Sequence, residues 1–200
     1  MCIRDRYRIS LGYAHQDGVL KTDKFNRYSS ALNLAPTFLN EHLSVNFNFK
    51  YTNTAKRFAD EGAIGSAVAF DPTQEVYANN AYGGYWEWLQ ANGKPMDLAT
   101  RNPLGLLNLR RNQSNVNRTV ANVQFDYKFH FFPDLHLQAN FGLDNASGRG
   151  DDMIDSLSAT NYLTKGRFSH YEQKKKNYLA DVSLFYSKNV ESINTKVDVL

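Results

Sequence analysis

The chain has 200 residues, of which 42% are hydrophobic and 14% aromatic, so it is long and apolar enough to bury a core. Its 23 basic and 20 acidic residues give a net charge of +3, without the concentrated positive excess of a nucleic-acid-binding protein. The single cysteine excludes an internal disulfide framework, and no apolar stretch approaches the ~18 residues of a membrane-spanning helix. The charged opening MCIRDR has no apolar run, and we expect residues 1–6 to be an artificial or truncated start.

Alternation of apolar and polar residues predicts the first three strands. The first runs from Tyr7 and is ended by Asp17-Gly18. The second covers about residues 24–35 and stops at Pro36, which has no amide hydrogen for a strand ladder. The third contains LSVNFNFKY at 43–51 and extends to about residue 53, with apolar side chains on one face and polar ones on the other.

Four further strands follow a long polar segment. The fourth, at about 115–131, shows the clearest alternation in the chain, and a turn at 132–134 leads into a fifth strand that begins at Leu135. A sixth strand is predicted at about 168–187. The sequence ends within a seventh, in which Val197 and Val199 alternate with polar residues.

The connections between these strands alternate in length. Residues 36–42, 132–134 and 188–193 are short connections, 16–23 is intermediate, and 54–114 and 146–167 are long. In an antiparallel sheet, alternate connections lie at opposite ends, so one end would carry tight turns and the other long loops. We therefore predict an all-β fold, an antiparallel up-and-down transmembrane β-barrel segment of about seven strands with long extracellular loops and short periplasmic turns.

A soluble β-sandwich also alternates, and a soluble extracellular carbohydrate-binding sandwich is the alternative interpretation. Three features favour a barrel whose apolar face contacts lipid over a soluble sandwich. The apolar rows of strands three to five contain no charge, which would cost about 2–4 kcal/mol at the bilayer midplane. The strands exceed the ~25 Å apolar band of a barrel. Aromatic residues mark both ends of the apolar rows, namely Tyr13, Tyr51 and Tyr178 at one end and Tyr7, Phe129, Phe131 and Tyr186 at the other.

Seven strands cannot close such a barrel without exposing strand edges to lipid, so the chain would be part of a larger protein. A passive porin is a third interpretation. It would differ from the others in lacking any domain inside the barrel.

The segment YRISLGYAHQDGVLKTDKFNRYS at 7–29 resembles the barrel of SusC/RagA-type TonB-dependent outer-membrane receptors of the Bacteroidota. The long connection is similar to that family in the order of its motifs, which are Phe70-Asp71-Pro72, Glu75-Val76-Tyr77, Gly83-Gly84-Tyr85 and Asn102-Pro103. The turn Phe132-Pro133-Asp134-Leu135, followed by a strand of the form LHLQANFGLD, is similar to another hairpin of the family. The resemblance covers nearly the whole chain from Tyr7.

The resemblance implies import of oligosaccharides or peptides across the Gram-negative outer membrane, energised through TonB. It implies a barrel filled by an N-terminal plug, which nothing in this chain matches, and a SusD-like lipoprotein as a lid. It implies no enzyme, cofactor or nucleic-acid partner, and the sequence contains no nucleophile, phosphate-binding or redox motif.

A barrel assigns the two faces of the strands to different surroundings. Outer-membrane lipid would contact Leu43, Val45, Phe47, Phe49, Phe125, Tyr127, Phe129, Leu135, Leu137 and Phe141. The lumen or plug would contact Asn46, Asn48, Lys50, Gln124, Asp126, Lys128 and Asn140.

Four aromatic residues in the long connection, Tyr82, Tyr85, Trp86 and Trp88, are the candidate ligand-binding residues, since flat rings suit sugar rings. The alternative is that they form a small core of the loop itself or contact the lid protein.

The remaining polar clusters give no defined site. The carboxylates of Asp60, Glu61, Asp151, Asp152 and Asp155 lack calcium-loop spacing and are interpreted as solvated loop charge. The histidines, including His130 and His136, complete no metal site. Lys174, Lys175 and Lys176 would either contact lipid phosphate or form a solvated strand extension.

Overall fold

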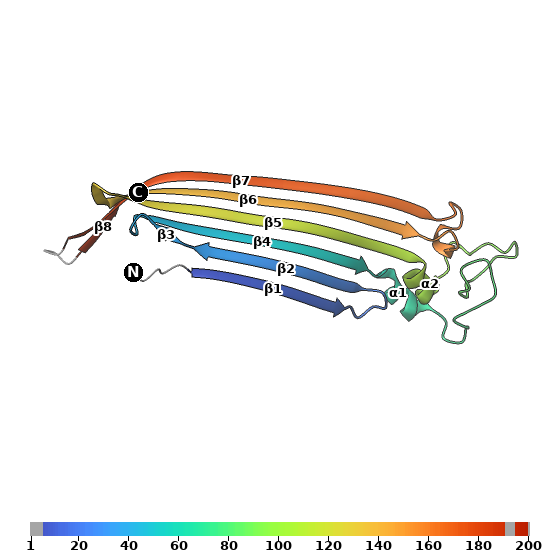
Figure 1. Cartoon of the computed structure of the whole chain (residues 1–200). Helices are drawn as coiled ribbons and strands as arrows, with labels where there is room; N and C mark the ends of the chain where they lie inside the picture. The colour runs from blue at the N-terminus through green and yellow to red at the C-terminus, as the bar shows by residue number, and fades with distance from the viewer. Residues whose placement is uncertain (1–5, 191–194, 200) are drawn as a thin grey trace.

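The computed structural model describes residues 6–190 and 195–199, which form one antiparallel sheet with two short α-helices near one end (Figure 1). The strands are β1 Arg6–Asp17, β2 Lys24–Ala35, β3 Thr37–Phe38, β4 Leu43–Phe58, β5 Arg110–Phe129, β6 Phe132–Ile154, β7 Arg167–Val190 and β8 Thr195–Val199. The helices are α1 Gly62–Ala69 and α2 Pro103–Asn108, with a 3-10 turn at Ala159–Asn161. Neither described α-helix has the length and apolar content needed to cross a membrane.

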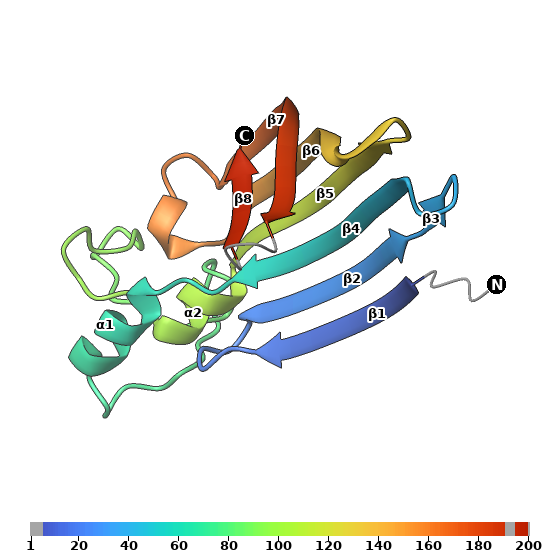
Figure 2. The same ribbon diagram turned by 90° about the vertical axis from the view of Figure 1, so that its left-hand side faces the viewer.

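The strands follow one another across the sheet in the order β1-β2-β4-β5-β6-β7-β8, and the two-residue β3 pairs with β4. Every neighbouring pair is antiparallel. Figures 1 and 2 show a single curved layer, with both helices beyond the same ends of β4 and β5. The predicted up-and-down antiparallel fold is confirmed, and the sheet is not closed within this chain.

The strand register aligns the apolar residues into continuous rows. Leu34 pairs with Phe47, Phe47 with Val123, Val123 with Phe141, and Phe141 with Ala180. Directly paired residues point to the same face of a sheet. One face therefore carries an apolar row across five strands, β2 and β4 to β7, and we call it the apolar-row face; the opposite one is the polar face.

No other part of the described chain covers the apolar-row face. Ile9 and Leu11 are 71% and 83% exposed. Besides Pro95 in the first long connection, the buried apolar side chains of the described residues are Ala63, Leu107, Ile154 and Ala159. These four lie in or beside the long connections rather than between two sheets. A β-sandwich requires a second layer. Since the described residues form only one, the soluble-sandwich alternative is wrong for them.

Several strands extend further than predicted. β4 continues to Phe58, β5 begins at Arg110, and β6 continues to Ile154. The long connections are therefore 59–109 and 155–166, not 54–114 and 146–167. The added segments, such as Thr54–Phe58, carry charged or polar side chains on both faces, so they show no alternation although their backbones remain paired.

Two shorter features also differ from prediction. The turn predicted at 132–134 lies at His130 and Phe131, and the ladder shifts register between Lys128 and Phe129. The predicted end of the second strand at Pro36 and the predicted seventh strand, now β8, are confirmed. Residues 1–5, within the expected artificial start, and residues 191–193 of the predicted last turn, with residue 194, lie outside the described residues.

Candidate functional site

The seven residues predicted to face the lumen or plug all lie on the polar face. Asn46 pairs with Gln124 and Gln124 with Asn140 across β4, β5 and β6, and Asn48, Lys50, Asp126 and Lys128 share that face by register. The ten residues predicted to face lipid lie on the apolar-row face.

Hydrogen bonds connect side chains of the polar face. Asn122 Nδ2 donates to Asn140 Oδ1 at 2.7 Å, and Asp126 accepts from His136 Nδ1 at 2.9 Å and Gln138 Nε2 at 3.1 Å. The polar face is a hydrogen-bonded wall.

A basic hollow of about 540 Å³ lies on this wall, lined by Arg27, Lys50 and Arg118 among others. Arg118 donates to Asp144 at 2.8 and 2.9 Å. In the part of the chain that the structure describes, neither Arg27 nor Lys50 forms an ion pair. The wall therefore presents uncompensated positive charge beside uncharged amides.

The long connection 59–109 is organised around Asn102, whose side chain is fully buried. Its Oδ1 accepts hydrogen bonds from the backbone nitrogens of Leu104 at 3.0 Å and Gly105 at 3.2 Å. Its Nδ2 donates to the carbonyl of Val76 at 2.9 Å and to that of Trp86 at 3.3 Å. One side chain thus caps α2 and binds two distant stretches of the connection.

The local sequence explains why α2 begins there. Asparagine is a preferred N-cap residue because its side-chain oxygen satisfies free backbone N–H groups of the first turn. Proline fits the first helical position, where no amide hydrogen is needed, and Pro103 occupies it. The Asn-Pro motif was noted in the sequence only as part of the family pattern, but its chemistry also predicts a helix start.

Trp86 and Trp88 pack on each other and on Phe70 next to α1. The two indole rings lie edge to face with centroids 4.6 Å apart, and Phe70 meets them at 5.9 and 4.9 Å. Both tryptophans are half-buried. Edge-to-face packing of this kind stabilises the connection from within.

The two candidate tyrosines are likewise engaged inside the connection. Tyr85 packs on Tyr77 with ring centroids 5.6 Å apart, and its hydroxyl accepts from Asn108 Nδ2 at 2.9 Å. Tyr82 donates from its hydroxyl to the carbonyl of Gly93 at 3.0 Å. The structure therefore brings the four candidate ligand-binding residues into one loop body, where each also has an internal contact.

Glu87 is the buried carboxyl group of this loop body, with 7% of its surface exposed. Its Oε1 accepts from the Asn102 backbone nitrogen at 3.0 Å, and its Oε2 lies 3.7 Å from Arg101 Nη1, too far for a hydrogen bond. Burial raises the pKa of Glu87 because it disfavours the charged form, and the Asn102 hydrogen bond and the Arg101 charge only partly oppose this. Burial is the larger effect.

A second contact set joins the long connection to the strand ends. Arg110 donates to Asp152 on β6 at 2.9 and 3.0 Å and to Asp60 at 3.0 Å, and Arg167 donates to Asp152 at 2.8 Å. Asp151 pairs with His170 at 2.6 Å. The interpretation of Asp60 and Asp152 as solvated loop charge is therefore wrong, because both are largely buried and paired with Arg110, whereas Asp151 is exposed and hydrogen-bonded to His170. Sequence spacing could not reveal this, since the partners lie 15 to 50 residues away.

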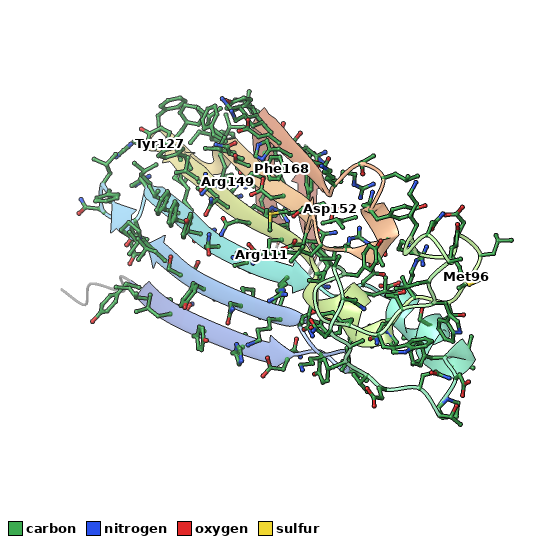
Figure 3. The ribbon with its side chains drawn as sticks, turned by 90° about the vertical axis from the view of Figure 1, so that its right-hand side faces the viewer. Met96, Arg111, Tyr127, Arg149, Asp152 and Phe168 are labelled. Carbon is green, nitrogen blue, oxygen red and sulfur yellow. The ribbon has the colours of Figure 1, made fainter. Side chains whose placement is uncertain are left out.

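Among the described residues, no group of three or more histidine, cysteine, aspartate or glutamate side chains could hold a metal ion. Figure 3 shows Arg111, Arg149, Asp152 and Phe168 on the strands toward the long connections, Met96 within them, and Tyr127 toward the short turns. The three charged side chains labelled there thus lie toward the end of the sheet that carries the long connections.

Comparison with known proteins identifies relatives of this chain. It is 40% identical over 182 residues to the TonB-dependent receptor SusC of Bacteroides thetaiotaomicron, a match that covers 83% of the chain and 18% of SusC. It is 29% identical over 121 residues to the TonB-dependent receptor P26 of Formosa agariphila, covering 60% of the chain and 11% of that receptor. No protein-family model matches.

Solved structures of the RagAB peptide importer share the fold. The closed-closed state superimposes with a TM-score of 0.61 at 20% identity, covering 94% of this chain and 21% of the matched one, and the open-open state gives 0.60. The chain therefore spans about a fifth of the length of the proteins it matches. The SusC match includes most of the chain, and the RagAB match shows that its open sheet corresponds to a portion of a receptor barrel. The chain belongs to the SusC/RagA-type TonB-dependent receptors of the Gram-negative outer membrane, a family of transport proteins rather than enzymes, and forms part of their barrel.

Proposed function

We propose that the receptor containing this chain imports oligosaccharides or peptides across the outer membrane, energised through TonB. The observation that carries the proposal is the 40% identity to SusC over 83% of the chain. The fold match to a peptide importer supports including peptides among the proposed substrates. A RagB- or SusD-like lipoprotein is the proposed partner, because the matched structures are of a two-protein complex.

In this proposal the apolar-row face contacts membrane lipid and the polar face contacts the lumen or plug. The support is the uncovered row of large apolar side chains on one face and the amide network on the other. This is the arrangement that alternation produces in a barrel wall. Passive diffusion is disfavoured by the relationship to energised receptors, since a porin has no TonB coupling.

The long connection takes the extracellular side in this proposal. Tyr82, Tyr85, Trp86 and Trp88 contribute to substrate binding there, either directly or through the loop shape that they maintain. Replacing Trp86 or Trp88 by alanine separates the two roles. If the ring contacts substrate directly, the variant loses substrate affinity while the hydrogen-exchange protection of the loop changes little. If the ring maintains the loop shape, protection of the loop falls together with affinity. Unchanged affinity in both variants would argue against a platform.

The proposal as a whole is tested by uptake in cells. A strain that carries the full-length receptor as its single importer of this type should accumulate labelled oligosaccharides or labelled peptides, and uptake should stop when TonB is deleted. Uptake that persists without TonB would indicate a passive pore. Binding of neither substrate class by the purified receptor, with its lipoprotein, would refute the proposed substrates.

A further inference from the structure

The apolar-row face changes its chemistry along the strands. The row through Leu32, Phe49 and Ala121 is apolar, but two rows further on Tyr28 pairs with Asn53, and Asn53 with Asn117. Further still, the same face carries Lys24, Asn26, Arg57, Gln113, Asn115, Arg149 and Asp151. Beyond its tyrosines, this outer wall is first amide-rich and then basic.

The amide zone is ordered by its own hydrogen bonds. Tyr51 donates from its hydroxyl to Asn117 Oδ1 at 2.9 Å. Asn53 Nδ2 donates to Asn117 Oδ1 at 2.7 Å and to Asn115 Oδ1 at 3.1 Å. A fixed line of amides next to a tyrosine can donate to and accept from hydroxyl groups.

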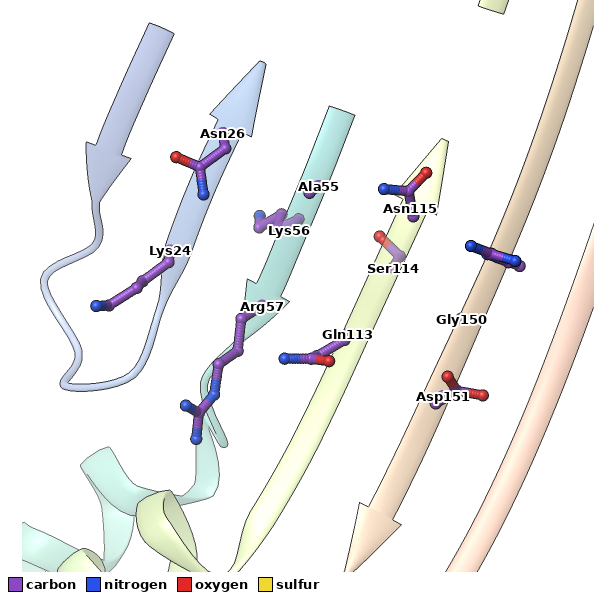
Figure 4. Close-up of a pocket in the computed structure, with 11 residues that line it drawn as sticks. Lys24, Asn26, Ala55, Lys56, Arg57, Gln113, Ser114, Asn115, Gly150 and Asp151 are labelled. Carbon is purple, nitrogen blue, oxygen red and sulfur yellow. The ribbon is translucent and has the colours of Figure 1, made fainter. Parts of the chain in front are cut away.

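A hollow of about 390 Å³ lies at the basic end of this wall, between β2, β4, β5 and β6 (Figure 4). Apart from Lys56, Ser114 and Gly150, its lining residues share the apolar-row face by register. The hollow therefore opens outward from the barrel wall, and the basic hollow of the polar face is a different one.

The residues lining this outer hollow carry more positive than negative charge. The neighbouring carboxylates Asp17, opposite Lys24, and Glu172, opposite Arg149, lie outside the lining, and their ion pairs are with His15 at 3.4 Å and Lys174 at 2.9 Å. Lys24 and Arg57 are direct register partners on β2 and β4, and like charges in directly opposite positions destabilise a sheet. In the part of the chain that the structure describes, neither forms an ion pair, and Arg57 Nε is buried without a hydrogen-bond partner. The single carboxylate of the hollow, Asp151, is already bonded to His170. A bound anion would relieve the repulsion and satisfy Arg57.

The height of the hollow indicates the kind of anion. Lys24 lies four residues beyond Tyr28, which is about 13 Å along a strand and roughly 10 Å along the normal of a tilted barrel. The headgroup region of a simple bilayer is only about 5–8 Å deep on each side. The hollow would thus meet a headgroup thicker than that of a phospholipid.

We propose that this outer hollow binds the anionic headgroup of a phosphorylated glycolipid in the outer leaflet. Lys24, Arg57 and Arg149 bind its phosphate groups, because guanidinium and ammonium donors form strong charge-assisted hydrogen bonds to phosphate. Asn26 and Asn115 bind sugar hydroxyls nearer the acyl chains. The proposal rests on the proposed orientation of the barrel wall, with the apolar-row face toward lipid and the long connection outside the cell, and is independent of what the receptor imports.

The test is native mass spectrometry of the full-length receptor released from nanodiscs of phosphatidylcholine containing lipid A, a phosphorylated diglucosamine lipid. Parallel arms use phosphatidylglycerol in place of lipid A, and lipid A with millimolar inorganic phosphate. We expect retained lipid A, little retained phosphatidylglycerol, and no displacement by phosphate. Equal retention of both lipids, or displacement by free phosphate, would overturn the assignment to a glycolipid.

The variant Lys24→Gln/Arg57→Gln/Arg149→Gln should bind lipid A at least about tenfold more weakly, since three charge-assisted contacts are removed. The matched control Arg27→Gln/Lys50→Gln/Lys128→Gln removes the same charge from the polar face, at residues that do not line the outer hollow, and should bind normally. Heat-modifiable migration in gels verifies that both variants are folded. Wild-type binding by the first variant, or equal loss in both, would refute the site.

Discussion

Replacing Asn102 by alanine should open the long connection without disturbing the sheet. The change removes the N-cap of α2, which costs about 1 kcal/mol. It also leaves the carbonyl of Trp86 without a donor, whereas that of Val76 keeps the bond from the Trp86 backbone nitrogen at 3.2 Å, and an unsatisfied buried group adds about 1–3 kcal/mol. Together these effects should lower the free energy of local opening by about 2–4 kcal/mol. The sheet should be unaffected, because the strand ladders make no use of this side chain.

Hydrogen-exchange mass spectrometry of the full-length receptor in nanodiscs measures this opening. Protection in peptides covering 74–109 should fall by about 30- to 1,000-fold, while β4 and β5 stay unchanged. Asn102→Ser retains a capping oxygen and should lose less. Asn79→Ala, at an exposed asparagine of the same connection, is the matched control and should have little effect. Unchanged protection in Asn102→Ala, or equal loss in the control, would refute the reasoning.

Three other predictions concern charge and burial. Because burial raises the folded-state pKa of Glu87 above its ordinary value of 4.5, its stabilising effect is full below pH 4.5 and is lost as pH rises through the raised value. Protection of 76–105, corrected for intrinsic exchange, should therefore fall toward neutral pH, and Glu87→Gln should abolish this dependence. Asp152→Asn should destabilise the contact to Arg110 by about 1–3 kcal/mol, seen as faster exchange at the ends of β5 and β6; unchanged exchange would contradict it. Phe47→Arg should lower the free energy of folding into vesicles by about 2–4 kcal/mol, and Asn48→Arg by clearly less; equal effects would contradict the assigned faces.

The sequence predicted the strands well where one face is apolar. From Leu43 to Tyr51 the alternation placed every residue on its observed face, because an apolar environment on one side selects apolar side chains at every second position. From Ala146 to Asp152 the strand continues with polar or small residues on both faces, so no period was present to detect. Alternation indicates that the two faces of a strand have different surroundings. Backbone pairing continues past the segment where this difference exists, so the strand is longer than its alternating part.

The loop body was less predictable because its contacts are long-range. The bonds from Asn102 to Val76 and from Arg110 to Asp60 join residues 26 and 50 positions apart, and no local pattern encodes such pairs. The start of α2 was predictable in principle from Asn102-Pro103, whereas α1 has no side-chain cap and gave no such signal. The aromatic residues were found from composition, but their packing on Phe70 and Tyr77 required the structure.

The central claim is that membrane hydrocarbon covers the apolar-row face. Spin labels placed one at a time at residues 45, 46, 47 and 48 of a cysteine-free full-length receptor in bilayers test it directly. The account predicts that collisions with dissolved oxygen, which concentrates in hydrocarbon, are frequent at Val45 and Phe47 and infrequent at Asn46 and Asn48. The reverse alternation, or equal accessibility at all four positions, would contradict it.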